Sequence, residues 1–447
     1  MKIGEIKELK IEYIDESGKG TAFLEDAPVK ISGVIAGETV EAKIIAFSGD
    51  TVYAKASRII TPASYRVVPK CPYVEECGGC QLQHIEYAEQ LNLKKSIVRN
   101  ALYDYASDEQ ISDTIGNYFP YKYRNKIHFA VARKNGKVIL GFFKEASKEI
   151  IDIPKCILHD KWAETLYNIC LNYIKTYKIE PYNIDKEVGL LKYITARSLG
   201  GNILVTFVIT GTVLPNADKL YAELVKEFKQ VGLYININNS TGNNVYSENF
   251  VHLKGRLALE AKFMDAEFEI LPPSFLQVNN EIMNKVYNKV IELAGAKEGK
   301  TILDLYSGIG ITSLIFARAG AQVVSVEIEK SAVYEARRMI KANKMSGKIN
   351  ALQGDCAMVL SNLSEYVSDP ENTTAFIDPP RSGLGKEMSK ILNESGVSKI
   401  IYLSCNPFTL ADDLEILTKN YRVTKVMPYD MFPQTAHIEA LVCLIKK

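Results

Sequence analysis

The sequence of 447 residues contains no apolar run long enough to cross a bilayer, and residues 1–7 lack the apolar core of a signal peptide. These absences exclude a membrane-spanning helix and predict a cytoplasmic protein without a membrane partner. A charge excess is also missing, because 54 Lys and Arg residues stand against 53 Asp and Glu residues. The chain as a whole therefore does not attract nucleic acid, and an RNA partner requires local basic patches.

Hydrophobic residues, by contrast, make up 47% of the chain, which is enough for the cores of roughly two to four domains. Residues 1–62 alternate short β-branched runs with Gly and Asp turns, which predicts a small OB-like barrel. Such barrels bind single-stranded nucleic acid on one face. Because acidic residues slightly outnumber basic ones in this segment, a purely structural cap is the alternative.

A central α+β domain is predicted over residues 63–270, where it shapes a cleft between the domains on either side. Within it, residues 118–129 interleave aromatic side chains with Lys and Arg. Aromatic faces stack on bases and cations neutralise phosphates, so this stretch has the composition of a single-stranded RNA surface. An ordinary pair of strands with a solvated charged face is the alternative. The expected helices are 85–105, 162–177 and 217–231, and the expected strands are 190–197 and 203–210.

Cysteines are clustered near the start of this central domain. In a reducing cytoplasm, clustered cysteines indicate a metal site or catalysis rather than disulfides. Four of the eight cysteines are candidate ligands of one site: Cys71, Cys77, Cys80 and Cys156. Four thiolates fit a zinc ion or a [4Fe–4S] cluster, and the spacing does not decide between them; unrelated buried thiols are the structural alternative. His84 and His159 are expected at the surface or in turns rather than as ligands.

The last part of the chain, residues 271–447, alternates strands with helices, which predicts a doubly wound, Rossmann-like parallel sheet. After its first strand, Gly308 and Gly310 let the backbone approach a bound nucleotide closely. Glu327, at the end of the next strand, is placed to accept hydrogen bonds from ribose hydroxyls. This part of the chain is therefore predicted to bind a nucleotide at the turn.

The nucleotide is predicted to be S-adenosylmethionine rather than a dinucleotide. Ser313 replaces the third glycine of the dinucleotide motif, which weakens the case for pyrophosphate binding. The acidic Asp304 near the turn suits a cationic ligand better. S-adenosylmethionine, which carries adenosine and a sulfonium but no phosphate, meets both conditions.

A single thiol follows another predicted strand. Residues 400–403 are apolar and precede Ser-Cys405-Asn-Pro, so the strand delivers Cys405 to the edge where open α/β sheets bind ligands. An isolated cysteine is more commonly a small core residue. Two acidic groups change that interpretation: Asp378, in an Asp-Pro-Pro-Arg381 motif, and Glu439, before the last strand. A thiol nucleophile beside a carboxylate base is typical of covalent catalysis.

These motifs resemble those of the RNA uracil-5 methyltransferases, the family that makes 5-methyluridine in ribosomal and transfer RNA. The resemblance rests on residues 378–383, 400–409 and 427–439, and it extends over nearly the whole chain. Residues 1–62 resemble the TRAM domain of the ribosomal RNA branch, and the four clustered cysteines resemble its [4Fe–4S] site. The family thus implies a TRAM barrel, a cluster-bearing central domain and a methyltransferase domain.

The resemblance also implies a reaction, the methylation of C5 of a uridine in large-subunit, 23S-type ribosomal RNA. Cys405 is the implied nucleophile that adds to C6, because C5 of uracil is itself a poor nucleophile, and Glu439 is the implied base. The implied contacts with S-adenosylmethionine are Gln277, Tyr306, Glu327 and Asp378. Ser307 and Tyr429 depart from the family's usual cysteine and phenylalanine, which bears on substrate choice only.

Two alternatives stay open at this point. Transfer RNA is a second target for the same chemistry, and a noncatalytic iron–sulfur RNA-binding protein or redox sensor is an alternative of another class. The expected protein is a monomer that binds RNA, S-adenosylmethionine and a [4Fe–4S] cluster.

Overall fold

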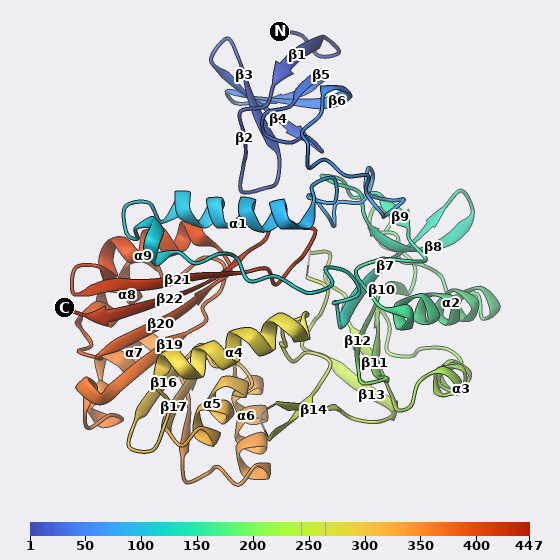
Figure 1. The fold of residues 1–447 in the computed structure, drawn as a ribbon. Helices are drawn as coiled ribbons and strands as arrows, with labels where there is room; N and C mark the ends of the chain where they lie inside the picture. Colours follow the sequence, from blue (N-terminus) through green and yellow to red (C-terminus); the bar gives the residue numbers. More distant parts are fainter. Residues whose placement is uncertain (243, 264) are drawn as a thin grey trace.

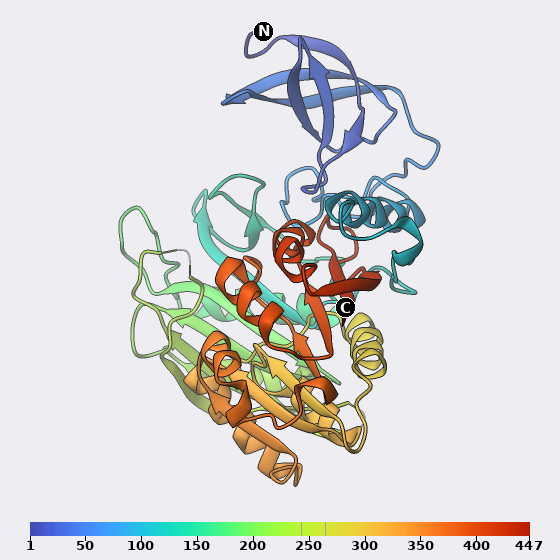
Figure 2. The ribbon, with the colours of Figure 1, turned by 90° about the vertical axis from the view of Figure 1, so that its left-hand side faces the viewer.

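The structure, a computed structural model, describes residues 1–242, 244–263 and 265–447. This part of the chain is organised as three large sheets that follow one another in sequence and have buried cores of their own. In Figures 1 and 2 the N-terminal sheet (blue) stands at one end of the molecule, next to helix α1 (Tyr87–Ala101). No helix in these residue ranges has both the length and the apolar character that crossing a bilayer requires.

The N-terminal sheet has six strands in the order β1-β5-β6-β4-β3-β2. They are β1 (Ile6–Lys10), β2 (Tyr13–Ile14), β3 (Gly20–Leu24), β4 (Ala27–Ser32), β5 (Thr39–Ser48) and β6 (Thr51–Thr61). Alternate side chains face the core, as in β5, where Val40, Ala42 and Ile44 are buried. The sixth strand ends at Thr61. The assignment of residues 1–62 as a separate OB-like TRAM barrel stays a prediction.

The central sheet has seven strands in the order β13-β12-β11-β10-β7-β8-β9. They are β7 (Lys126–Lys134), β8 (Lys137–Phe143), β9 (Ile150–Asp152), β10 (Leu191–Leu199), β11 (Asn202–Ile209), β12 (Val231–Ile237) and β13 (Phe250–Gly255). Helices α2 (Lys161–Thr176) and α3 (Ala217–Glu227) share its core, which includes Phe129 and Phe207. The expected helices and strands are confirmed, except that two helices end four residues early: α1 ends at Ala101 rather than residue 105, and α3 ends at Glu227 because β12 already begins at Val231.

The C-terminal sheet also has seven strands, in the order β18-β17-β16-β19-β20-β22-β21. They are β16 (Thr301–Leu305), β17 (Gln322–Glu327), β18 (Ile349–Gln353), β19 (Thr373–Ile377), β20 (Lys399–Ser404), β21 (Tyr421–Tyr429) and β22 (Glu439–Lys446). Strands β16 to β20 pair in parallel, as predicted. The expectation of a wholly parallel sheet is wrong at one edge, where β22 runs antiparallel to β20 and β21. The short connection over residues 430–438 (the β21–β22 loop) is the physical reason, because parallel neighbours need a longer crossover.

Helices cover both faces of this sheet (Figure 1). One face packs against α4 (Asn280–Ala294), α5 (Ile311–Arg318), α6 (Lys330–Ala342) and the hairpin of β14 (Leu259–Phe263) and β15 (Ala266–Ile270). The other face packs against α1, α7 (Cys356–Ser361), α8 (Gly385–Glu394) and α9 (Pro407–Leu417). Short 3-10 turns occur at Asp108–Gln110, Leu363–Glu365 and Pro370–Asn372.

One helix from the range predicted for the central domain, residues 63–270, packs on the C-terminal sheet, and the domain limits themselves stay a prediction. Helix α1 belongs to that range, yet Val98 shares a core with the C-terminal sheet. After α1 the chain runs beside β21, where Ile111 pairs with Val426 and Ile115 pairs with Tyr429. An apolar stripe in a sequence shows that a helix packs on a core, but it does not specify which of two sheets the helix covers.

Candidate active site

Four strands of the C-terminal sheet place polar side chains at the side of the sheet where its parallel strands end. Strands β16, β19 and β20 are parallel neighbours, so their carboxyl ends lie together and are followed by Tyr306, Asp378 and Cys405. Strand β22 is antiparallel and therefore starts at this side, with Glu439 as its first residue. Ser404, which precedes Cys405, pairs with Ala440, which follows Glu439, so Cys405 and Glu439 lie at adjacent strand ends. The structure thus brings the predicted nucleophile and the predicted base together.

The position of Cys405 is set by the start of α9. Asn406 caps this helix, because its side-chain oxygen accepts a hydrogen bond from the N–H of Phe408 at 3.1 Å. Pro407 occupies the first turn, where a missing N–H carries no penalty. The strand therefore ends and the helix begins within two residues of the thiol, which leaves Cys405 half-buried rather than part of the core.

The thiol of Cys405 opens into a pocket of about 190 Å³ that is also lined by Arg381, Phe408 and His437. Burial raises the pKa of Cys405 to about 11; the carboxyl of Glu439 adds to this shift, and the guanidinium of Arg381 opposes it. In this state of the protein the thiol is therefore protonated at neutral pH. A nearby cation is what stabilises the thiolate form.

Arg381 is held beside Cys405 by contacts at both ends. Its guanidinium donates a hydrogen bond to Nδ1 of His437 at 3.1 Å. Its carbonyl accepts hydrogen bonds from Thr409 Oγ1 at 3.1 Å and from Asn406 Nδ2 at 3.3 Å. Burial, together with the charge of Arg381, lowers the pKa of His437 to about 4. The imidazole is therefore neutral at physiological pH and can accept this hydrogen bond.

Two buried carboxyl groups, those of Asp378 and Glu439, lie close enough to the thiol of Cys405 to raise its pKa. Burial raises the pKa of Asp378 to about 7, and the neighbouring Asp304 adds to the shift. Burial also raises the pKa of Glu439 well above its ordinary value, and here Asp378 adds to the shift. A buried carboxyl with a raised pKa is a stronger base once it is ionised, which suits a group that removes a proton.

The predicted nucleotide turn joins β16 to the start of α5. Gly308 and Gly310 have φ angles of +54° and +79°, in the left-handed region that glycine adopts without strain. Tyr306 also has a positive φ angle, +60°. The carboxylate of Glu327 accepts a hydrogen bond from the N–H of Gly308 at 2.9 Å. A carboxylate has further acceptor positions, so Glu327 closes the turn and can still accept hydroxyl donors.

Asp304 is fully buried beneath this turn. Thr312 Oγ1 donates to its Oδ2 at 2.7 Å, and the hydroxyl of Ser313 donates to the same oxygen. Ser313, which stands where a dinucleotide motif has glycine, therefore has a structural partner. The other oxygen, Oδ1, is buried without a hydrogen-bond partner among the described residues. Gln277 is also buried, and its backbone carbonyl accepts a hydrogen bond from Asn125 Nδ2 at 3.0 Å.

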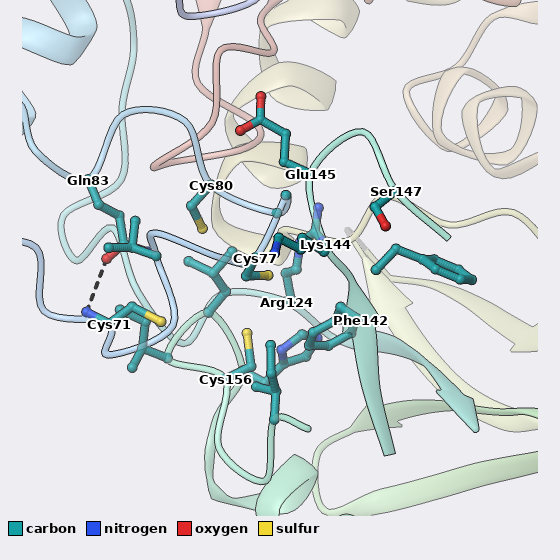
Figure 3. A pocket seen from close by; sticks show the side chains of 18 of the residues that line it. Cys71, Cys77, Cys80, Gln83, Arg124, Phe142, Lys144, Glu145, Ser147 and Cys156 are labelled. Atoms are coloured by element: carbon teal, nitrogen blue, oxygen red, sulfur yellow. Dashed lines mark hydrogen bonds between the residues drawn. The ribbon is translucent and has the colours of Figure 1, made fainter. Parts of the chain in front are cut away.

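The clustered cysteines line a different cavity, which has a volume of about 490 Å³. Figure 3 shows the four thiols around one space: Cys71, Cys77, Cys80 and Cys156. Burial raises the pKa of Cys80 to about 12 and that of Cys156 to about 11. Within the described ranges, no three His, Cys, Asp or Glu side chains are close enough to hold a single metal ion as they stand. The structure therefore brings these cysteines together, and the metal stays a prediction.

Both histidines near the cysteines are buried, so the surface position expected for them is wrong, although His84 does lie in a turn. The ring of His84 bonds to the carbonyl of Val34 at 3.1 Å, and the ring of His159 bonds to the carbonyl of Lys126 at 3.0 Å. Burial lowers the pKa of both histidines. The sequence did not indicate this, because burial in a loop follows no period.

The aromatic and basic stretch over residues 118–129 divides into two parts. Tyr118 is almost fully exposed and Phe119 is about half exposed. Ile127 and Phe129 face the core of the central sheet. Only the first part of the stretch is therefore available for stacking on bases, and the RNA contact itself stays a prediction.

Sequence reasoning missed the residues of α1 that hold the β21–β22 loop. The ammonium of Lys94 forms a fully buried ion pair with Asp430 and donates to the carbonyl of Phe432 at 3.2 Å. Gln90 and Gln434 form two hydrogen bonds, at 3.1 and 3.2 Å. A lysine in the apolar stripe of a helix is the signal that could have identified this contact, because such a charge requires a buried partner.

Comparisons with known proteins agree over the length of the chain. A profile of the family described as tRNA (uracil-5-)-methyltransferase matches residues 86–447. An uncharacterized RNA methyltransferase of Clostridium acetobutylicum is 33% identical, over 98% of this chain and 96% of that protein. A second uncharacterized RNA methyltransferase, from Clostridium tetani, is 31% identical over 98% of this chain and 95% of that protein.

A solved structure extends the comparison to the fold. The crystal structure of Pyrococcus abyssi tRNA (uracil-54, C5)-methyltransferase in complex with S-adenosyl-L-homocysteine matches with a TM-score of 0.77 and 26% identity, over 98% of this chain and 99% of that chain. Because both the family profile and the relatives are RNA methyltransferases, the noncatalytic alternative is set aside. With its α/β methyltransferase fold, the chain belongs to the tRNA (uracil-5-)-methyltransferase family of RNA methyltransferases.

Proposed function

We propose that the protein methylates C5 of a uridine in RNA, with Cys405 as the nucleophile and Glu439 as the base. The observation that carries this proposal is the adjacency of these side chains at the ends of β20 and β22. Because C5 of uracil is a poor nucleophile, the reaction requires a thiolate that adds to C6 and a base that removes the C5 proton. A cysteine and a carboxyl at one sheet edge provide both groups.

The reaction divides into three steps at these residues. The Cys405 thiolate forms an Sγ–C6 bond, and the C5=C6 electron pair moves into an enolate. When S-adenosylmethionine is bound, C5 would accept its methyl group as the sulfonium–methyl bond breaks, and S-adenosylhomocysteine would be the leaving group. Glu439 then takes the C5 proton, the C–H electron pair restores the C5=C6 double bond, and the Sγ–C6 bond breaks to return the thiolate. The charge of Arg381 favours the thiolate against the effect of burial.

For the methyl donor we propose contacts at the carboxyl ends of the parallel strands and in the segment before α4. The proposed contact residues are Gln277, Tyr306, Glu327 and Asp378. We add Asp304, because its buried Oδ1 has no partner among the described residues and a sulfonium carries the opposite charge. A cation near Asp378 favours the ionised form of the buried carboxyls and thereby keeps Glu439 competent as a base.

We also propose that the four clustered cysteines hold a [4Fe–4S] cluster. Their common cavity supports this, and so do two buried N–H groups in its wall that have no acceptor among the described residues, on Gln83 and Arg124. A bound cluster would join residues 71–80 to the segment around Cys156. Its role is structural, because methyl transfer to uracil involves no net electron transfer.

For the RNA we propose large-subunit ribosomal RNA, on the basis of the four-cysteine set. Transfer RNA is the second candidate, which the similarity to a tRNA (uracil-54, C5)-methyltransferase favours. We propose that the N-terminal sheet is a TRAM domain that contacts this RNA close to the reacting base. Glu16, in the turn between β2 and β3, supports this, because it lines the same pocket as Cys405.

The test uses two variants and total RNA from cells that lack the gene. Cys405→Ala should abolish both 5-methyluridine formation and the covalent RNA adduct on denaturing gels, and an adduct in this variant would contradict the mechanism. Glu439→Gln should accumulate the adduct, because the C5 proton is not removed. Cys443→Ala, a buried thiol of β22, is the control. Mass spectrometry of separated RNA fractions shows whether the methyl group enters ribosomal or transfer RNA.

A further inference from the structure

Arg124 lies in the wall of the cysteine-lined cavity, two residues before β7 begins. Figure 3 shows it close to Cys77. Its Nε–H is buried without an acceptor in the described part of the chain, and the nearby ion pairs, Lys122–Asp160 and Lys155–Glu164, do not involve it.

Gln83 presents a second unused donor to the same cavity. Its Oε1 accepts the backbone N–H of Cys71 at 3.2 Å, and this bond orients the amide. Its Nε2 is buried and has no acceptor among the described residues. Gln83 as a whole is only 2% exposed, and it lines the cavity together with the four cysteines. Two donors from separate segments thus require an acceptor in this cavity.

An anion is the acceptor that suits Arg124 best. Its guanidinium is charged at any pH that a protein tolerates, and its Nε–H is buried in the cavity wall although the residue as a whole is partly exposed. A metal group held by four thiolates keeps a net negative charge, and its sulfur atoms accept N–H hydrogen bonds. The occupied cysteine site therefore supplies the acceptor that both donors lack.

The opposite side of Arg124 faces the β21–β22 loop. Its guanidinium carbon lies 5.9 Å from the ring centroid of Phe432, close enough for a cation–π contact. The ring of Phe432 in turn packs edge-on against His437, with 5.9 Å between centroids. His437 is the acceptor for Arg381 beside the reactive thiol. A continuous series of contacts therefore leads from the cysteine cavity to the candidate active site.

Residues next to Arg124 and to the cysteines contact the same loop. The hydroxyl of Tyr123 donates to the carbonyl of Pro433 at 3.1 Å. The N–H of Leu82 donates to the carbonyl of Gln434 at 3.0 Å. Leu82 follows Cys80 by two residues, so any group that fixes the cysteines also fixes one side of the β21–β22 loop.

We propose that Arg124 is a positioning residue that couples the occupied cysteine site to the β21–β22 loop. The bound metal group orients the guanidinium, and the guanidinium holds Phe432, which keeps His437 and Arg381 aligned with Cys405. This inference rests on the proposed function, because it takes the four cysteines as metal ligands and the pocket at Cys405 as the active site.

The experiment compares Arg124→Gln with wild type after purification without oxygen. Iron release to a chelator is followed by visible absorption, and amide hydrogen exchange is measured by mass spectrometry. Arg124→Gln should lose iron about tenfold faster, as expected when a hydrogen bond to the metal's sulfur ligands is lost. Exchange in residues 430–438 should rise in this variant and in chelator-treated wild type alike, whereas exchange in residues 301–327 should not change.

Two further variants make the result specific. Arg124→Lys keeps the charge but loses the planar donor fork, so its iron release should be intermediate, and it carries the test if Arg124→Gln does not fold. Arg133→Gln, which alters an exposed arginine paired with Glu180, should behave as wild type.

Separate outcomes distinguish this inference from the proposed function. Wild-type iron release and wild-type loop exchange in Arg124→Gln would overturn it, and so would unchanged loop exchange in the chelator-treated wild type. A protein that contains no iron overturns both this inference and the cluster assignment. Failure of Cys405 to form an RNA adduct refutes the proposed chemistry, while the exchange measurement still supports or overturns the coupling.

Discussion

Lys94 on α1 and Asp430 in the β21–β22 loop form an ion pair in which both side chains are fully buried. Lys94→Met keeps most of the apolar stem but removes the ammonium, which leaves the carboxylate of Asp430 buried without a cation. Removal of one partner from a buried pair costs about 3–5 kcal/mol. The hydroxyl of Tyr87 still donates to Asp430 at 2.8 Å, so we expect the lower end of this range, about 3 kcal/mol.

Thermal unfolding followed by circular dichroism measures this loss. A change of 3 kcal/mol corresponds to a decrease in Tm of roughly 6–12 °C for a domain of this size. The double variant Lys94→Met/Asp430→Asn should lose less stability than the sum of its single variants, because no uncompensated charge remains. Lys95→Met, at the neighbouring surface position, is the control and should change stability by less than about 1 kcal/mol. A loss below about 1 kcal/mol in Lys94→Met, or additivity within about 0.5 kcal/mol, would refute the reasoning.

Three further predictions concern the site and the N-terminal sheet. Adduct formation by Cys405 should accelerate about tenfold per pH unit between about pH 7 and 9, because burial raises the pKa of the thiol to about 11 and the thiolate is the reactive form. Denaturing gels of quenched reactions measure this rate, and a rate that levels off below about pH 8 would contradict the prediction. Gly310→Ala should weaken the binding of S-adenosylhomocysteine measured by calorimetry, because φ at this position is +79° and the new Cβ would lie 3.1 Å from the Cβ of Ala336. The control is Gly299→Ala, which is also at positive φ but has open space around it, and it should not change the affinity. Burial acts to raise the pKa of Glu38, but hydrogen bonds from Arg66 and two backbone N–H groups outweigh this and hold the pKa below 4.5. The ionised Glu38 therefore stabilises the fold above pH 4.5, and this stabilisation is lost as the pH falls through the lowered pKa. Glu38→Gln should flatten this acid dependence of stability in thermal unfolding.

Local sequence determined the elements that carry the site. The branched apolar residues 400–403 specify β20, and Asn406 and Pro407 specify the start of α9, so the exposed end of the strand at Cys405 could be read directly. Gly308 and Gly310 likewise indicated the turn after β16, where the backbone has positive φ angles. These features depend on side-chain shape and backbone preference within a few residues, which is why they are predictable without a fold.

Only the tertiary structure decided which of these elements meet. It turned β22 antiparallel, which brings Glu439 beside Cys405, and it placed α1 on the C-terminal sheet, which buries Lys94 against Asp430. It also gathered Cys156 with the earlier cysteines and placed Arg124 between their cavity and the β21–β22 loop. Such pairings join residues far apart in the chain. They depend on how whole surfaces fit together, and the periodicity of a single segment contains no information about its partner.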